Sequence, residues 1–202
     1  MSKEVAKYLT RADPVLGRFI KKYEPVTLTP NNRITLFEAL VKSVIGQQLS
    51  GKAAHSILTK LKDQVGGKTP ISPEKILGTP FGKIRGAGVS ESKARTIVAL
   101  AEMTETGAIP SARKMKGMSD EKIIEILTSV KGIGRWTVEM ILMFKLGRKD
   151  VMPATDLGVR KGYSIIFGHR DLETPKTILK HSQKWSPYRS FVAKYFWTAA
   201  DE

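Results

Sequence analysis

Two glycines in a short turn are the first residues whose type and spacing suggest chemistry. Gly132 and Gly134 flank one isoleucine in SVKGIGRWTVEMIL, residues 129–142, and an apolar helical pattern lies on each side. Glycine adopts conformations closed to residues with a Cβ, so we expect both glycines to help the chain reverse within few residues. The amides after such a turn point outward together at a helix N-terminus and bind phosphate. Lys131 and Arg135 add positive charge.

A simple corner between two helices is the alternative, and a bare Gly-x-Gly would favour it. Three features weaken that alternative: the small apolar residue between the glycines, the helical patterns on both sides and the strongly basic chain.

Asp156 is the candidate for carboxylate chemistry. Pro153 ends the preceding segment, which predicts Asp156 at or near the N-cap of the next helix, where free amides and the dipole favour a carboxylate. The alternative is a purely structural cap, paired with Arg160 four residues on. The residues alone favour that alternative.

The charge balance indicates a polyanionic partner. The 202 residues contain 34 Lys+Arg against 19 Asp+Glu, a net charge of +15, while 41% hydrophobic residues exclude wholesale disorder. Nucleic acid is the leading interpretation and an anionic membrane surface the second. A lysine-rich solubility coat is the common alternative.

Composition excludes several site classes. The chain has no cysteine, so it has no disulfide, thiolate metal site or cysteine nucleophile. His55, His169 and His181 are too far apart in the sequence to favour a zinc site. The N-terminal residues lack the apolar core of a signal peptide, and no apolar run approaches the ~20 residues that span a bilayer. We therefore expect a soluble intracellular protein.

Helical periodicity, punctuated by Pro and Gly, runs through the chain, whereas strand signals are scarce. One segment carries its apolar residues on a single side: Leu36, Phe37, Leu40, Val41, Val44 and Ile45. The sequence predicts an all-α protein of about ten helices, in the segments 12–23, 31–50, 51–67, 72–80, 90–107, 119–130, 134–147, 155–168, 174–185 and 186–200.

Three motifs make the sequence recognisable: VIGQQLSGKAA (44–54), SVKGIGRWTVEMILMFKLGRKDVMPATDLGVRKGY (129–163) and WSPYRSFVAKYFW (185–197). In this order they resemble the helix-hairpin-helix (HhH-GPD) DNA glycosylases, and most closely the alkylbase branch, 3-methyladenine DNA glycosylase II. The hairpin alone is a generic DNA-backbone binder, but the three motifs together are highly specific. The resemblance extends over roughly residues 36–197.

The resemblance implies two helical lobes with an active-site cleft between them. One lobe, residues 36–148, is a helical barrel that ends in the helix-hairpin-helix. The second lobe combines residues 1–35 with 149–202 and carries the catalytic aspartate.

The resemblance also implies an activity: flipping out alkylated purines, of the 3-methyladenine and 7-methylguanine type, and hydrolysing the N-glycosidic bond in base excision repair. Asp156 matches the essential aspartate, which stabilises a cationic sugar and orients or deprotonates a water. In relatives that also cut the strand a lysine follows the hairpin. Here Trp136 stands in its place, and indole is no nucleophile, so we expect a monofunctional enzyme without AP lyase activity.

Four residues match the family's base pocket, where a cationic base stacks on indole: Trp136, Trp197, Gln47 and Met140. Core packing is the alternative for the tryptophans, and it is strongest for Trp197. That residue lies in an aromatic run with Trp185, Tyr188, Phe191, Tyr195 and Phe196.

DNA contacts follow from the same resemblance. Gln48 matches the residue that fills the gap left by the flipped base, with Ser50 beside it facing the minor groove and Ser90 as a second candidate. The alternative is that GQQLSG only joins two helices. The backbone-binding hairpin comprises Lys131, Gly132, Ile133, Gly134 and Arg135, and the carbonyls that match a structural Na⁺ or K⁺ site belong to Thr128, Val130 and Ile133.

We therefore expect a monomer that binds damaged double-stranded DNA, needs no cofactor for catalysis and does not bind membranes. Its place would be the cytoplasm or nucleoid in a bacterium or archaeon and the nucleus in a eukaryote. Two alternatives remain open: a non-catalytic damage-sensing or architectural DNA-binding protein of the same fold, and a glycosylase for deaminated or oxidised bases.

Overall fold

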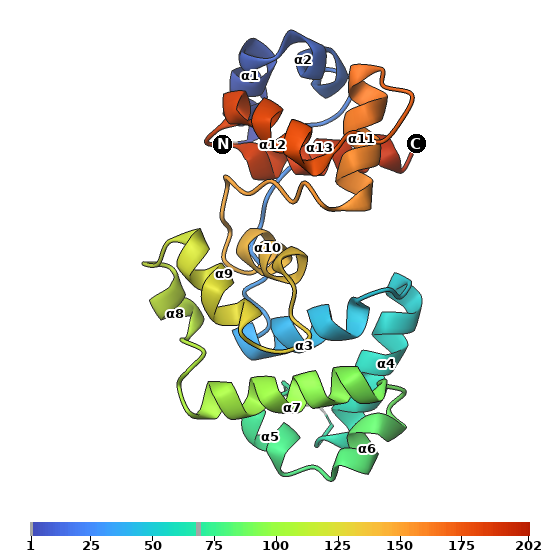
Figure 1. Ribbon diagram of the computed structural model, residues 1–202, viewed down its shortest axis with the longest axis vertical. Helices are drawn as coiled ribbons and strands as arrows, with labels where there is room; N and C mark the ends of the chain where they lie inside the picture. The colour runs from blue at the N-terminus through green and yellow to red at the C-terminus, as the bar shows by residue number, and fades with distance from the viewer. Residues whose placement is uncertain (1, 68–69) are drawn as a thin grey trace. The chain divides into compact units, whose positions relative to one another are not determined.

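The computed structural model describes residues 2–67 and 70–202, and every regular element in that part of the chain is a helix (Figure 1). The expected all-α class is confirmed. The thirteen α-helices and one 3₁₀-helix of the described residues are α1 (Ser2–Ala12), α2 (Pro14–Ile20), α3 (Leu36–Gly46), α4 (Gly51–Gln64), α5 (Pro73–Leu77), α6 (Phe81–Gly86), α7 (Glu91–Glu105), α8 (Ala112–Met115), α9 (Asp120–Thr128), α10 (Arg135–Phe144), α11 (Leu157–Phe167), α12 (Pro175–His181), η1 (Ser182–Trp185) and α13 (Arg189–Ala200).

The chain divides into two compact units. The first contains the chain up to Pro30 together with Leu142–Glu202, and the second contains Asn31–Ile141. The division into functional lobes at residues 36 and 148 stays a prediction.

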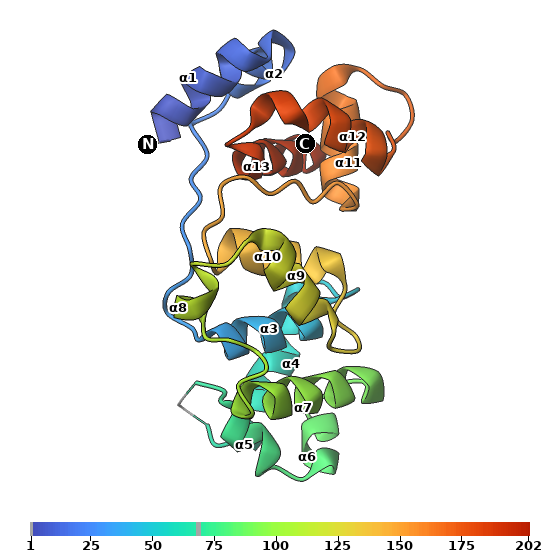
Figure 2. The same ribbon diagram turned by 60° about the vertical axis from the view of Figure 1, so that its left-hand side comes forward.

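In the second unit, α7 is the central helix. It packs against α3 on one side and against α5 and α6 on the other (Figure 2). The core forms where the apolar side of α3 meets α4 and α7. All six apolar α3 residues expected on one side are buried: Leu36, Phe37, Leu40, Val41, Val44 and Ile45.

Hydroxyl side chains define the helix starts in this unit. A Ser or Thr N-cap accepts from the amide three residues on, which satisfies one of the free N–H groups of the first turn. The N-caps of α3, α4, α5, α8 and α9 that do this are Thr35, Ser50, Ser72, Ser111 and Ser119. Ser90 occupies the N-cap of α7 but its hydroxyl makes no capping bond; Oγ lies 3.4 Å from that of Ser92.

The first unit joins helices from the two ends of the sequence. Asp13, 1% exposed, caps α2 through the amides of Val15 and Leu16, and accepts from Trp185 Nε1 at 3.1 Å and from Lys184 Nζ at 2.9 Å. Asp13 is the N-cap of α2, with Pro14 at the first helical position. Because Asp13 bonds Trp185 and Lys184 of η1, it fastens α2 to the C-terminal helices.

Core packing explains most of the C-terminal aromatic run. Trp185, Phe191, Tyr195 and Phe196 are each at most 1% exposed. Trp197, which follows them on α13, is only half-buried. Three helices were not expected from the sequence: α1, α6 and α8.

Candidate active site

The two glycines of the hairpin have different reasons to be glycine. Gly132 has φ +94°, and a Cβ there would lie 2.2 Å from Thr96 Oγ1. Gly134 has no positive φ, and a Cβ there would meet nothing within 4 Å. The expectation that both glycines need conformations closed to other residues is therefore wrong for Gly134, and the space in front of it is open to a ligand.

The hairpin between α9 and α10 presents backbone to solvent. Ile133 is 4% exposed and anchors the turn in the core, while Lys131, Gly132, Gly134 and Arg135 are exposed. The Ile133 amide donates to Val130 O at 3.0 Å. Arg135 begins α10, and its Nε donates to Oε1 of the buried Glu139 at 3.1 Å. The cationic side chains of Lys131 and Arg135 therefore flank the amides at the α10 N-terminus, and residue 134 has no side chain that would cover them.

Gln47 joins the loop between α3 and α4 to this hairpin. Its Nε2 donates to Gly132 O and to Thr137 Oγ1, both at 3.1 Å. Since a backbone carbonyl can only accept, the amide orientation follows from the Gly132 contact. The side-chain nitrogen of Gln47 thus donates within the protein, whereas the side-chain oxygen can accept a hydrogen bond from a ligand.

A pocket of about 650 Å³ in the second unit brings several predicted residues together. Its lining includes Gln47, Gln48 and Ser90 from the loops, and Gly134 with the half-buried Trp136 from the hairpin. Ser50 and Met140 are not part of this lining; Ser50 Oγ instead caps α4, accepting from Ala53 N.

Lys93 also lines this pocket and was missed by sequence reasoning. It lies in the first turns of α7 and its Nζ donates to the carbonyls of Ile45 and Gln47. A lysine on an amphipathic helix gives no local sign that it bonds carbonyls more than forty residues away.

Asp156 occupies the N-cap of α11, as predicted. Its Oδ1 accepts from Val159 N at 2.9 Å and from Trp197 Nε1 at 2.7 Å, and the residue is half-buried. The guanidinium of Arg160, the partner considered for a structural cap, donates to the carbonyls of Glu173 and Leu172. A backbone donor, Val159 N, and an indole donor, Trp197 Nε1, therefore both contribute to the orientation of the Asp156 carboxylate.

Two glycines let α11 approach α13 this closely. A Cβ at Gly158 would lie 2.7 Å from Trp197 Cδ1 and 3.1 Å from Asp156 Oδ1. A Cβ at Gly162 would lie 1.8 Å from the carbonyl oxygen of Phe196. Neither position can carry a side chain without moving Trp197 or the α13 backbone.

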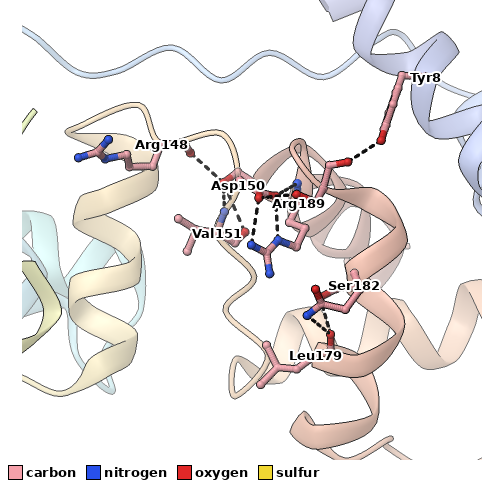
Figure 3. A network of polar contacts seen from close by, with 10 residues as sticks. Tyr8, Arg148, Asp150, Val151, Leu179, Ser182 and Arg189 are labelled. Atoms are coloured by element: carbon pink, nitrogen blue, oxygen red, sulfur yellow. Dashed lines mark hydrogen bonds and ion pairs between the residues drawn. The ribbon is translucent and has the colours of Figure 1, made fainter. Parts of the chain in front are cut away.

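The segment before Asp156 is fastened to the start of α13 (Figure 3). Arg189 Nε and Nη2 donate to Asp150 Oδ1 and Oδ2 at 2.8 and 3.0 Å, and Ser186 Oγ donates to Oδ2 at 2.8 Å. Burial raises the pKa of the Asp150 carboxyl, but the hydrogen bonds from Arg189 and Ser186 outweigh it and hold the pKa below its usual value.

A buried serine adds to this attachment. Ser190 Oγ donates to Arg148 O at 2.8 Å and accepts from Val151 N at 2.9 Å (Figure 3). The start of α13 therefore holds residues 148–151, and Trp197, nearer the end of the same helix, holds Asp156. Sequence reasoning missed Asp150, Arg189 and Ser190, because partners 39 residues apart leave no local pattern.

The predicted site residues fall in both units. Asp156 and Trp197 belong to the first unit, with Trp197 also 5.9 Å from the ring of Phe144, and Gln47, Trp136 and Met140 belong to the second. Among residues 2–67 and 70–202, His, Asp and Glu form no group of three that could hold a metal ion. Nor does any helix there have the length and apolarity to cross a membrane.

Known proteins resemble most of this chain. A DNA-3-methyladenine glycosylase 1 of Schizosaccharomyces pombe is 41% identical over 161 residues, covering 80% of this chain and 71% of that protein. An alkylbase DNA glycosidase-like protein of the same yeast is 32% identical over 196 residues, covering 96% and 92%.

Solved structures agree with these relatives. The S. pombe 3-methyladenine DNA glycosylase in complex with abasic DNA matches with a TM-score of 0.86 and 36% identity, covering 96% of this chain and 95% of that one. A DNA-3-methyladenine glycosidase from Bacillus halodurans matches with a TM-score of 0.87 and 34% identity, covering 97% and 88%. Residues 41–187 match the family described as HhH-GPD superfamily base excision DNA repair protein. The chain belongs to this HhH-GPD superfamily.

Proposed function

We propose that this protein is a DNA glycosylase that releases alkylated purines, of the 3-methyladenine and 7-methylguanine type, from double-stranded DNA by hydrolysis. The observation that carries the proposal is the Asp156 carboxylate, held by Val159 N and Trp197 Nε1 at the start of α11. The 41% identity to a protein named DNA-3-methyladenine glycosylase supports the choice of substrate class.

The reaction breaks the bond between C1′ of the deoxyribose and the base nitrogen. The bonding electrons leave with the base, which is cationic when alkylated and therefore departs neutral. The sugar acquires oxocarbenium character, which the negative charge of Asp156 stabilises. A water oxygen then bonds C1′ and passes a proton to the carboxylate. Because the leaving group is already activated, the reaction needs little help from a general acid.

The product is an abasic site in an intact strand. Covalent strand cleavage by this class of enzyme needs an amine nucleophile beside the sugar, and Trp136 occupies the matching position in α10. Borohydride should therefore trap no complex between the protein and a damaged duplex.

Duplex DNA binds through the hairpin and through the basic surface. The exposed amides after Gly134, with Lys131 and Arg135 beside them, suit a phosphate at the positive end of α10. Gln48, exposed at the rim of the pocket, fills the gap left by the flipped nucleotide, with Ser50 towards the minor groove and Ser90 as the other candidate. One monomer suffices for these contacts.

We propose that Trp136, Trp197, Gln47 and Met140 contact the flipped base. Both tryptophans are half-buried, so each keeps part of its ring accessible. The indole of Trp197 has two tasks in this proposal, because its N–H orients Asp156 while its face stacks on the base.

A Na⁺ or K⁺ ion fits the hairpin carbonyls. Thr128 is the last residue of α9, where helix carbonyls lack intrahelical partners, and Val130 O accepts one bond from Ile133 N and keeps a second lone pair. With Ile133 O these oxygens are the hard ligands such an ion takes. The ion would brace the turn; it takes no part in bond cleavage.

The test is release of free base from single-lesion duplexes in single turnover. We expect release of 3-methyladenine and 7-methylguanine, none from undamaged DNA, and strands that stay intact until alkali is added. Binding to these duplexes without release of any base would show a non-catalytic DNA-binding protein, and release of only deaminated or oxidised bases would overturn the substrate assignment.

A further inference from the structure

Lys93 has an unusual position for a lysine in a protein of net charge +15. Its Nζ donates to Ile45 O at 2.9 Å and to Gln47 O at 2.7 Å, at the C-terminal end of α3. The last carbonyls of a helix have no intrahelical partners and carry the negative end of its dipole, so an ammonium there caps the helix. Burial lowers the pKa of Lys93, in keeping with a side chain directed into the protein.

The two carbonyls that Lys93 bonds both precede a residue with a strained backbone. Gln48, the next residue, has φ +56° and is the one non-glycine residue with a positive φ in the described part of the chain. Leu49 N closes the turn on Gly46 O at 3.3 Å. A side chain in the left-handed region persists only where its surroundings hold it there. Lys93 bonds two of the carbonyls that lead into this turn.

Thr96 lies one turn after Lys93 on α7 and contacts the hairpin. Its Oγ1 is 2.9 Å from Lys131 O and 3.1 Å from Ser92 O, as donor to either. The side chain is 6% exposed and fills the space beside Gly132 where a Cβ would otherwise lie. Residues three apart share a helix face, so Lys93 and Thr96 connect one side of α7 to both the loop and the hairpin.

Gln47 completes the connection from the loop side. Its backbone oxygen accepts from Lys93, and its side chain donates to Gly132 O. The loop Gly46–Leu49 and the hairpin are therefore held to each other directly and to the same turn of the central helix α7.

We infer that Lys93 and Thr96 are positioning residues that fix the Gly46–Leu49 loop relative to the hairpin phosphate site. The inference rests on the proposed function, in which the hairpin binds a phosphate and Gln48 enters the vacated space in the duplex. A fixed distance between them sets which nucleotide leaves the stack once a phosphate is bound. The Lys93 ammonium acts through protein carbonyls and does not serve as a phosphate ligand.

The salt dependence of binding separates these two roles of Lys93. Loss of one phosphate contact reduces the slope of log K against log salt by about 0.9, whereas loss of a positioning residue leaves the slope unchanged. Lys93→Met should keep the wild-type slope in fluorescence anisotropy. A fluorescent base analogue beside the lesion should report a smaller unstacked population. Excision should slow by up to about 10²-fold, as expected when reacting groups are misplaced by an ångström.

Arg95→Met is the matched control. Arg95 is exposed on the same helix, pairs with Glu91 at 2.7 Å and carries the same charge. Its loss should leave unstacking and excision at the wild-type level. Equal defects in Lys93→Met and Arg95→Met, or a reduced slope in Lys93→Met alone, would overturn the inference.

Thr96 gives a second, independent pair of variants. Thr96→Val removes the donor to Lys131 O, while Thr96→Ser retains it, so only the valine variant should reduce unstacking. If Lys93 and Thr96 fix one relationship, the double variant Lys93→Met/Thr96→Val should lose less than the sum of the two single losses. Melting temperatures show whether each variant is folded. Unstacking and salt slope require no excision, so they decide the inference even if the wild type releases no base, a result that would reject the proposed function instead.

Discussion

The indole N–H of Trp197 donates to Oδ1 of Asp156 across 2.7 Å, joining α13 to the first turn of α11. Through this bond Trp197 has a polar role, whereas the sequence predicted only that its ring stacks on a base. It also makes the geometry of the carboxylate depend on a residue 41 positions away in the chain.

Asp156→Asn should leave the fold intact and remove base release. The asparagine oxygen still accepts from Val159 N, so α11 keeps its cap, whereas the negative charge at the reacting centre is lost. We expect a fall of about 10²–10⁴-fold in single-turnover release of 3-methyladenine, with unchanged DNA affinity. Asp201→Asn, an exposed change after α13, is the control. Release by Asp156→Asn at the rate of that control would reject the catalytic assignment.

Trp197→Phe should slow excision without weakening DNA binding. Phenylalanine keeps an aromatic ring near Phe144 but lacks the N–H that reaches Asp156. Loss of a hydrogen bond to a charged group corresponds to about 10- to 100-fold in rate. Gly158→Ala should have a similar effect, because its Cβ would displace the Trp197 ring. If Trp197 acts only by stacking, Trp197→Phe will excise bases at the wild-type rate. Trp197→Phe and Gly158→Ala will then not share the slower excision expected here.

The two hairpin glycines should separate stability from binding. Gly132→Ala places a Cβ against Thr96 at a φ of +94° and should lower the free energy of unfolding by about 1–3 kcal/mol. A Cβ at position 134 meets no atom within 4 Å, so Gly134→Asp should melt like the wild type while binding damaged and undamaged duplexes more weakly. Denaturant unfolding and anisotropy measure the two effects. A Gly134→Asp protein that lost only lesion-specific binding would place Gly134 in the base pocket instead.

Two substitutions at Gln48 separate the effect of its side chain from the effect of its strained backbone conformation. Gln48→Ala keeps a Cβ at φ +56°, whereas Gln48→Gly relieves that conformation. If the side chain fills the vacated space, both variants should lose unstacked population equally, although only the glycine variant gains stability. Duplexes with a mismatch opposite the lesion should reduce the defect, because a weakly paired base needs less help to leave. Full activity of both variants opposite every partner would leave GQQLSG as a connection between helices.

Stability should fall in acid in two steps that arise in the first unit. Burial lowers the pKa of His181, so its neutral form is favoured in the folded protein, and folding loses stability as the pH falls below the unfolded value of about 6.5.

The second step belongs to Asp13. Burial raises the pKa of its carboxyl, but hydrogen bonds from Lys184, Leu16 and Trp185 outweigh burial and lower it. Its contribution is therefore complete above about pH 4 and is lost as the pH falls through the lower folded value. Unfolding by denaturant at a series of pH values should show the first step disappear in His181→Gln and the second in Asp13→Asn. Unaltered profiles would contradict both assignments.

Local patterns carried the successful predictions. The apolar side of α3 and the N-cap role of Asp156 each depend on residues within a few positions of one another. The short helices α6 and α8 were missed because four to six residues are too few to display a helical period. In α1 only Val5 and Leu9 are buried.

The hydrogen bonds that orient the candidate site were beyond prediction for a different reason. Lys93, Arg189 and Trp197 each bond a group that is distant in the sequence, and each looks locally like an ordinary surface or core residue. The sequence predicted a turn at the two glycines. Only the structure shows that Gly132 requires a conformation suited to glycine, whereas Gly134 faces open space. The spacing of residues in the sequence identifies a candidate chemical group, whereas packing between distant segments determines the orientation of that group.

The attachment of the Asp156 segment to α13 has a consequence for synthesis of the protein. A ribosome delivers Asp156 and the hairpin well before Arg189–Ala200, and domains form as their segments emerge. Until α13 has emerged, no Ser190 holds Val151 and no indole reaches the carboxylate. A nascent or prematurely terminated chain thus carries the phosphate-binding turn without an aligned acid group. The ability to cut bases from DNA is withheld until the last helix described here has docked.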